Sequence, residues 1–248
     1  MLYRTEGIVI RTMDYGEGHK ILSLFTRSLG KVSVMVRGAK KVKSRYSAIA
    51  QLFTHGDFVI YKGSQMGTLN HGEPIHSYQG LREDLHKAAY AAYLVELADR
   101  ILPEAEPDLV MFEQLTAGLS AIDEGKDPTI VLHIIEMKML ALSGYHPQLD
   151  ECVSCGRAAG EMVLSPMQGG ILCSACKGKD HSAVPVPATI LRLLRLFQRV
   201  DLRMLGTADV KPETKKRLKA AMRAFMDAHL DIRWKSRNFI DQMEKYNI

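Results

Sequence analysis

Four cysteines stand in two closely spaced pairs, Cys152 with Cys155 and Cys173 with Cys176, and seventeen residues separate the pairs. A Cys-x2-Cys turn lets two thiolates converge on one ion, and two such turns supply the four tetrahedral sulfur ligands that Zn²⁺ prefers. The spacing therefore predicts a zinc ribbon with Cys152, Cys155, Cys173 and Cys176 as its ligands. Because protein ligands fill all four positions, we expect a structural and not a catalytic ion.

Three other uses of these thiols compete with a zinc site. Disulfides need an oxidising compartment, and the start of the chain lacks the basic and then apolar pattern of a secretory signal. A dithiol redox site needs one Cys-x-x-Cys and would leave the second pair without a purpose. An iron site of the rubredoxin kind uses the same four thiolates, so the sequence leaves the choice between zinc and iron open.

Positive charge is concentrated near the start of the chain. Residues 1–80 contain eleven Lys or Arg against five Asp or Glu, and no acidic residue occurs from Gly18 to Gly56. Five cations fall within the nine residues from Arg37 to Arg45. Such a field attracts polyanions, and a flexible basic loop can follow a phosphate backbone. The predicted DNA-binding residues are Lys31, Arg37, Lys40, Lys41, Lys43 and Arg45.

The first eighty residues have the pattern of a small β-barrel. Val32, Val34 and Val36 alternate with polar or basic residues, as expected of a strand with one buried face. Further strands are predicted at Ile8–Arg11, Lys20–Thr26, Asp57–Lys62 and Thr68–Ile75. Five short strands separated by turn residues favour an OB-fold, with an SH3-like barrel as the alternative. Lys31 and Arg37 are expected on its open face, and one or two of the aromatic residues Tyr3, Phe25, Tyr46, Phe53, Phe58 and Tyr61 are expected to stack on bases.

Helical spacing dominates after Gly80, so the predicted fold class is α+β. Helices are expected over residues 81–102, 107–122, 129–142, 188–204 and 212–234, with prolines marking several boundaries. The predicted organisation is an OB-fold domain at 1–80, a helical domain at 81–150 and 181–248, and a four-cysteine zinc element at 151–180.

A second group of cations lies on the helix expected after the cysteines. Arg192, Arg195 and Arg199 recur every three or four residues and therefore share one side of a helix, together with Arg203. Lys215, Lys219 and Arg223 do the same on the last predicted helix. Such stripes commonly face water, and the functional alternative is that they add contacts to phosphates.

Signals for other classes of protein are missing from the sequence. It has no phosphate-binding glycine loop, no Gly-x-Ser-x-Gly and no His-Glu-x-x-His, so we expect no enzyme. No apolar run is long enough to cross a membrane, which predicts a cytoplasmic protein. Binding to DNA would make it nucleoid-associated.

Several short segments, in this order and spacing, resemble the RecO family of bacterial recombination mediators. They are Gly38-Ala39-Lys40-Lys41 through Ser44-Arg45, Gly144 to Cys152 with Cys155-Gly156, Gly169 to Cys173, and Lys235-Ser236-Arg237. The resemblance implies an N-terminal OB-fold, a helical domain with a zinc-binding element, binding of single- and double-stranded DNA, and annealing of complementary strands. It also implies that RecR and the acidic tail of single-strand binding protein are partners, and that RecA is loaded on covered DNA. For that acidic, partly apolar tail the predicted site is Arg192, Arg195 and Arg199, beside Leu193 and Phe197. The alternative hypothesis is a zinc-stabilised protein adaptor with incidental DNA contact.

Overall fold

The computed structural model of this protein describes residues 1–62, 66–207 and 209–246. The chain forms two compact units, of which the first comprises Met1–Pro128 together with Trp234–Ile248 and the second comprises Thr129–Arg233. The expected boundary near residue 80 marks the change from strands to helices, but the first compact unit continues past it. The second unit is thus inserted into the sequence of the first.

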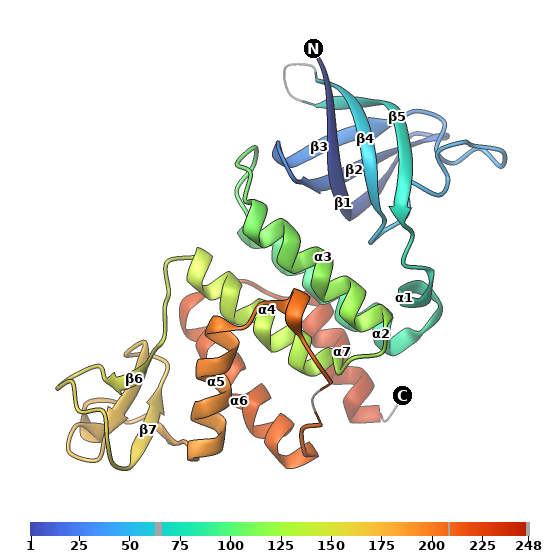
Figure 1. Ribbon diagram of the computed structural model, residues 1–248. Helices are drawn as coiled ribbons and strands as arrows, with labels where there is room; N and C mark the ends of the chain where they lie inside the picture. Colours follow the sequence, from blue (N-terminus) through green and yellow to red (C-terminus); the bar gives the residue numbers. More distant parts are fainter. Residues whose placement is uncertain (63–65, 208, 247–248) are drawn as a thin grey trace. The chain divides into compact units, whose positions relative to one another are not determined.

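A closed five-stranded barrel begins the first unit (Figure 1). Its strands are joined in the order β1-β2-β3-β5-β4, and β1 pairs with β4 to close the barrel. All pairings are antiparallel except the short parallel pairing of β3 with β5. This five-stranded closed arrangement confirms the predicted OB-like barrel. The strands are β1 (Leu2–Tyr15), β2 (His19–Thr26), β3 (Gly30–Val36), β4 (His55–Lys62) and β5 (Gly67–His76).

The barrel interior is apolar because alternate residues of its strands point inward. Leu22, Leu24, Val34 and Val36 are fully buried there, in agreement with the period-two pattern of the sequence. The first strand is longer than the predicted Ile8–Arg11, since it pairs with β4 over its first half and with β2 over its second half.

In the part of the chain that the structure describes, four α-helices complete the first unit. α2 begins after Asp84, whose carboxylate accepts a hydrogen bond from the Lys87 backbone N–H, and it packs against both β1 and α7. At the start of α7, the Glu96 carboxylate of α2 accepts hydrogen bonds from the backbone N–H groups of Lys235 and Ser236, at 2.9 and 2.8 Å. Trp234 is buried beside Tyr93. The helices are α1 (Gln79–Glu83), α2 (Leu85–Ile101), α3 (Leu109–Asp123) and α7 (Lys235–Tyr246).

The second unit combines three helices with a four-stranded sheet of order β6-β8-β7-β9. Cys152 ends β6 and Cys173 ends β8, while Cys155 and Cys176 lie in the turns that follow these strands. α5 packs against both β6 and α6. The helices are α4 (Pro128–Leu142), α5 (Ala188–Arg199) and α6 (Pro212–His229), and the strands are β6 (Gln148–Cys152), β7 (Met162–Ser165), β8 (Gly170–Cys173) and β9 (Val184–Pro185).

Two helix predictions were wrong at their ends. The helix expected to reach residue 204 ends at Arg199, and a separate 3-10 turn follows at Leu202–Met204. The helix expected to reach residue 234 ends at His229, where Leu230 takes an extended conformation, and α7 was not predicted. Among the described residues, no helix has the length and apolar character needed to cross a membrane.

Candidate nucleic-acid interface and metal centre

The segment from Arg37 to Arg45, called the basic loop below, leaves β3 at the end of the barrel. It is anchored at both ends, because the flanking residues Val36 and Tyr46 belong to the barrel core, and so does Ala39 within the loop. Between them the chain forms successive turns, with Lys41 N–H bonded to Gly38 O and Ser44 N–H bonded to Lys41 O. The loop is therefore a set of exposed side chains held on a fixed base.

Most cations of the basic loop are available to a ligand. Arg37, Lys41, Lys43 and Arg45 are exposed and form no ion pair with the residues that the structure describes. Arg45 lies over the ring of Tyr46, with 4.7 Å from its guanidinium carbon to the ring centroid, which holds this cation near the loop base. Lys40 is also exposed, but its ammonium forms an ion pair with Asp14. The predicted cluster thus brings four unpaired cations together.

Lys31 does not belong to this surface, and the expectation that it lies on the open face was wrong. Its side chain is only 10% exposed, and its ammonium lies 2.6 Å from the backbone oxygen of Asp99 and 3.2 Å from Glu104 Oε1. The adjacent Gly30 has φ of 67°, and any larger side chain there would collide with the backbone of Glu106. Lys31 therefore joins β3 to the segment after α2.

Most of the aromatic residues considered for base stacking are part of the core. Phe25, Phe53 and Phe58 are at most 3% exposed. Tyr46 is buried and donates its hydroxyl to the Asn70 backbone oxygen, whereas Tyr3 is partly exposed and Tyr61 is 59% exposed. Tyr15, at the end of β1, is 49% exposed and was missed because the predicted first strand stopped at residue 11.

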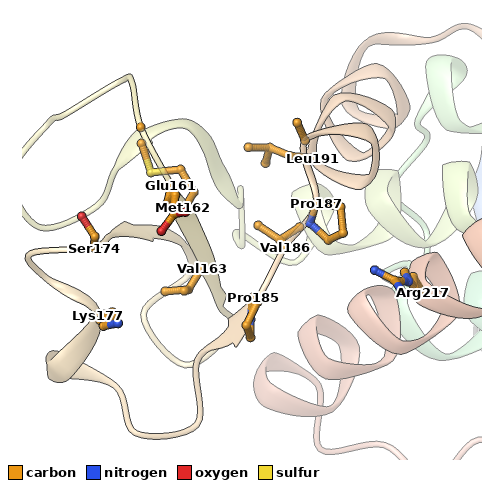
Figure 2. A pocket seen from close by; sticks show the side chains of 12 residues that line it. Glu161, Met162, Val163, Ser174, Lys177, Pro185, Val186, Pro187, Leu191 and Arg217 are labelled. Carbon is orange, nitrogen blue, oxygen red and sulfur yellow. The ribbon is translucent and has the colours of Figure 1, made fainter.

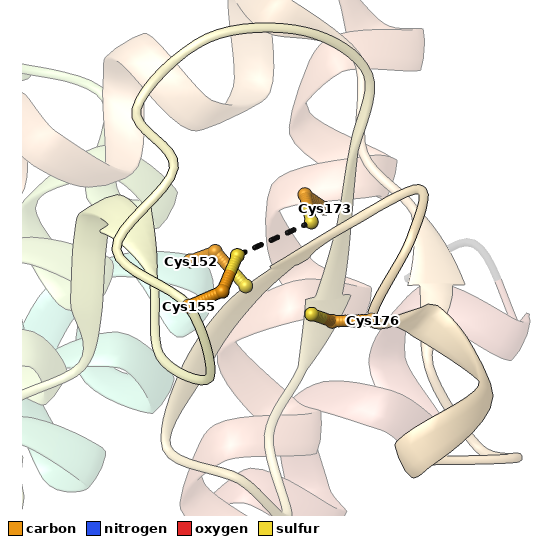
Figure 3. Close-up of side chains that lie close together, drawn as sticks. All are labelled: Cys152, Cys155, Cys173 and Cys176. Carbon is orange, nitrogen blue, oxygen red and sulfur yellow. Dashed lines mark hydrogen bonds between the residues drawn. The ribbon is translucent and has the colours of Figure 1, made fainter.

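The four cysteines converge in the second unit (Figure 3). All four sulfurs lie within 4.8 Å of one another, and those of Cys155 and Cys173 are 3.6 Å apart. Zn–S bonds of about 2.3 Å in a tetrahedron place sulfurs about 3.8 Å apart, so these positions fit a tetrahedral zinc ion. Cys152 and Cys173 are buried, while Cys155 is exposed.

Two tight turns hold these sulfurs in place. Gly156 N–H bonds to Cys152 O and Cys176 N–H bonds to Cys173 O, which closes each Cys-x2-Cys turn. Gly156 has φ of 72°, a conformation that favours glycine. Lys179 donates to Ser154 Oγ at 2.6 Å and so ties the second turn to the first.

The thiols of Cys152 and Cys155 differ in acidity because each one interacts with its neighbours and with nearby backbone N–H groups. Burial raises the pKa of Cys152, but backbone N–H groups of Cys173, Ser154 and Cys155 outweigh burial and lower that pKa to about 6. At Cys155 the Arg157 N–H lowers the pKa, but the three neighbouring thiols raise it to about 11. Negative charge therefore builds up as successive thiols ionise. A divalent cation would remove this repulsion, so the donor set fits Zn²⁺.

The predicted arginine stripe on α5 is mostly engaged within the second unit. Arg195 Nε donates to Leu149 O at 2.8 Å and lies 3.2 Å from the Asp150 carboxylate. Arg199 forms an ion pair with the same carboxylate at 3.0 Å. These arginines join α5 to β6. Arg192 is exposed and has no ion-pair partner among the described residues.

The apolar part of the predicted partner site is also less accessible than expected. Phe197 is only 2% exposed, and Leu193 is partly buried. These residues therefore offer little surface to a partner.

A cavity of about 630 Å³ lies elsewhere in the second unit (Figure 2). It is bordered by β7, β9 and the first turn of α5. Lys177 and Arg217 lie on opposite sides of it in this view, and Pro187 precedes α5 without a side-chain cap. The cavity combines an apolar lining with the cations Lys177 and Arg217, and Glu161 also lines it. Arg217 forms an ion pair with Glu213 of α6. Its apolar lining includes Met162, Val163, Pro185, Val186 and Leu191.

Comparison with known proteins gives consistent matches along the chain. The family described as Recombination protein O N terminal matches residues 1–78, and Recombination protein O C terminal matches residues 82–238. A Bacillus pumilus protein named DNA repair protein RecO is 45% identical over 98% of this chain and 95% of its own length. Proteins of the same name from Bacillus subtilis and Halalkalibacterium halodurans are 44% and 41% identical, each over 98% of this chain and 96% of the relative.

Proposed function

This chain belongs to the RecO family of DNA repair proteins, and on that premise we propose that it is a non-enzymatic DNA-binding mediator of recombination. It would bind single- and double-stranded DNA and anneal complementary strands. With RecR it would help to load RecA on DNA that is covered by single-strand binding protein. A protein with this task would work in the cytoplasm, at the nucleoid.

The observation that carries this proposal is the set of four exposed, unpaired cations in the basic loop: Arg37, Lys41, Lys43 and Arg45. Two DNA strands repel each other through their phosphates, so annealing requires cations that neutralise this charge and release bound counterions. No covalent step is needed. The fixed base of the loop keeps its cations together, so they would contact successive phosphates of one strand.

The salt dependence of DNA binding tests this surface. Four phosphate contacts predict a slope of log affinity against log salt of about −2.8 for single strands, from about −0.7 per contact. The double variant Lys41→Ala/Lys43→Ala should flatten the slope by about 1.4. Lys211→Ala/Lys216→Ala removes the same charge from exposed positions near the start of α6 and should leave it unchanged. An unchanged slope in the loop variant would mean that DNA binds to another surface of the protein.

The structural metal in this proposal is Zn²⁺, held by Cys152, Cys155, Cys173 and Cys176. When bound, it would cross-link the two Cys-x2-Cys turns and stabilise the sheet of the second unit. The closed set of four sulfurs supports a structural role, and the sulfur spacing supports zinc.

Partner binding is proposed at the cavity of the second unit and not at the arginine stripe. An acidic, partly apolar tail, as in single-strand binding protein, suits the apolar lining flanked by Lys177 and Arg217. Lys177→Ala/Arg217→Ala should weaken binding of an acidic peptide with apolar residues, whereas Arg192→Ala should not. The opposite result would mean that the peptide binds to the arginine stripe on α5.

The second candidate function, a zinc-stabilised adaptor with incidental DNA contact, rests on the same cavity. The two functions differ in what the loop variant and the cavity variant lose. A mediator should bind both a DNA oligomer and the peptide. The loop variant should lose only DNA binding, and the cavity variant should lose only peptide binding. An adaptor should bind the peptide strongly and show no effect of the loop variant on any activity.

A further inference from the structure

The outer face of the first three strands carries an exposed, mainly apolar strip. Alternate residues of a strand share a face, and residues directly opposite in antiparallel strands lie on the same side. In this register Met13 lies opposite Ile21, Ile21 lies opposite Met35, and Tyr15 lies opposite His19. These five residues are called the outer strip below. Their neighbours along β2 and β3, such as Leu22 and Val34, point into the barrel core.

The outer strip is accessible. Met13 is 52% exposed and Tyr15 is 49% exposed, while His19, Ile21 and Met35 are partly exposed. Apolar side chains that are gathered on an open surface commonly mark a binding site. An exposed tyrosine offers a ring face on which another flat group can stack.

The outer strip is directly connected to the basic loop. His19 Nδ1 accepts a hydrogen bond from the Gly38 backbone N–H at 3.0 Å, and the Lys40 N–H donates to Gly18 O at 3.2 Å. Arg37 follows Met35 by two residues, at the point where β3 enters the loop. An aromatic ring and several unpaired cations therefore lie on contiguous parts of the barrel.

We propose that Tyr15 stacks on an unpaired base of a nucleic-acid strand whose phosphates are bound by the basic loop. Single-strand binders combine a positive track with aromatic platforms of this kind. Met13 and Met35 would form the apolar floor beside the ring. Because bases inside a duplex are already paired and stacked, Tyr15 would favour single strands over duplex DNA. This inference rests on the proposed function, and it names the base as the part of the DNA strand that the outer strip contacts.

The test separates stacking from charge. Tyr15→Ala should weaken binding of an oligothymidine by at least about fivefold at fixed salt, as loss of one stacked base does. The salt slope should stay the same, since no phosphate contact is lost. Tyr15→Phe keeps the ring and should bind like the parent protein. Tyr246→Ala removes an exposed tyrosine at the end of α7 and should have no effect.

An abasic oligomer of equal length decides the mechanism, because it keeps the phosphates and lacks the bases. Tyr15→Ala should bind this oligomer as the parent protein does. An equal loss on both oligomers, or no loss on oligothymidine, would overturn the inference. Failure of the proposed function would look different, since Lys41→Ala/Lys43→Ala would then leave the salt slope unchanged whatever Tyr15 does.

Discussion

Lys40 donates a hydrogen bond of 2.7 Å from its ammonium to the carboxylate of Asp14, so a residue of β1 neutralises one cation of the basic loop. The hydrogen bond from Lys40 lowers the pKa of Asp14 below its usual value. The carboxylate is therefore ionised at neutral pH. Phosphate oxygens approaching the loop have to compete with this carboxylate for Lys40.

Asp14→Asn should strengthen binding of single-stranded DNA and make its salt slope steeper by about 0.7, because Lys40 becomes available as one more phosphate contact. Fluorescence anisotropy of a labelled oligomer over a salt series measures both quantities. Glu17→Gln is the matched control. Glu17 is exposed on the turn that follows β1, and its substitution removes the same charge. If both variants steepen the slope equally, net charge and not the ion pair is responsible.

His55 should make the stability of the first unit depend on pH. Burial lowers the pKa of His55, although Glu6 opposes this shift, and His76 and Arg27 add to it. The unfolded imidazole titrates near about 6.5. Stability is therefore fully present above that pH and is lost as the pH falls toward the lowered folded pKa, because the unfolded chain takes up the proton first.

Thermal unfolding between neutral and mildly acidic pH measures this effect. His55→Gln should reduce the loss of melting temperature on acidification. His71→Gln changes an exposed histidine of β5, and this variant should lose as much melting temperature on acidification as the parent protein. Identical pH profiles for His55→Gln and the parent protein would contradict the prediction.

Removal of the metal should destabilise the second unit. We expect one zinc ion per chain, and Cys173→Ser should lower this content, because three sulfurs no longer close the tetrahedron. Binding of structural zinc contributes about 10–16 kcal/mol in small zinc domains, so the sheet around the cysteines should become sensitive to protease. Elemental analysis and limited proteolysis provide the readouts. Ser154→Ala, which lies between two ligands, should keep its zinc.

Arg195 should matter more for folding than Arg199, although both contact Asp150. The Arg199 pair is solvent-exposed on both sides, with 69% and 57% of the side chains accessible, and such pairs contribute about 0–1 kcal/mol. Arg195 is 33% exposed and also donates to Leu149 O. Urea unfolding should therefore show a larger loss for Arg195→Ala than for Arg199→Ala. Equal losses would mean that the bond to Leu149 adds nothing.

The features that the sequence predicts well are local. The cysteine turns depend on residues three apart, and the sulfurs of Cys152 and Cys155 meet those of Cys173 and Cys176 as expected. The barrel strands follow from alternation within short segments. The cations of the basic loop are exposed, as a dense run of charges is expected to be, because burying an unpaired charge is costly.

The features that the sequence does not reveal depend on distant partners. The strand pattern predicts that Lys31 is exposed. It is buried because its ammonium donates to the backbone oxygen of Asp99, 68 positions later in the chain. Arg199 reads as a surface cation until Asp150, 49 positions earlier, reaches it. Tyr15 lies in the half of β1 that pairs with β2, and Met13 and Tyr15 alternate with Thr12 and Asp14. That alternation was the signal for a longer strand.

The return of the chain to its first unit sets an order of events during protein synthesis. Trp234 and α7, which pack on Tyr93 and α2, leave the ribosome only after the entire second unit has been translated. Until then the surface of α2 that they cover stays bare. While more than a hundred further residues are synthesised, the nascent chain would therefore be a partly folded intermediate with this surface of α2 exposed. A chaperone would bind at this stage.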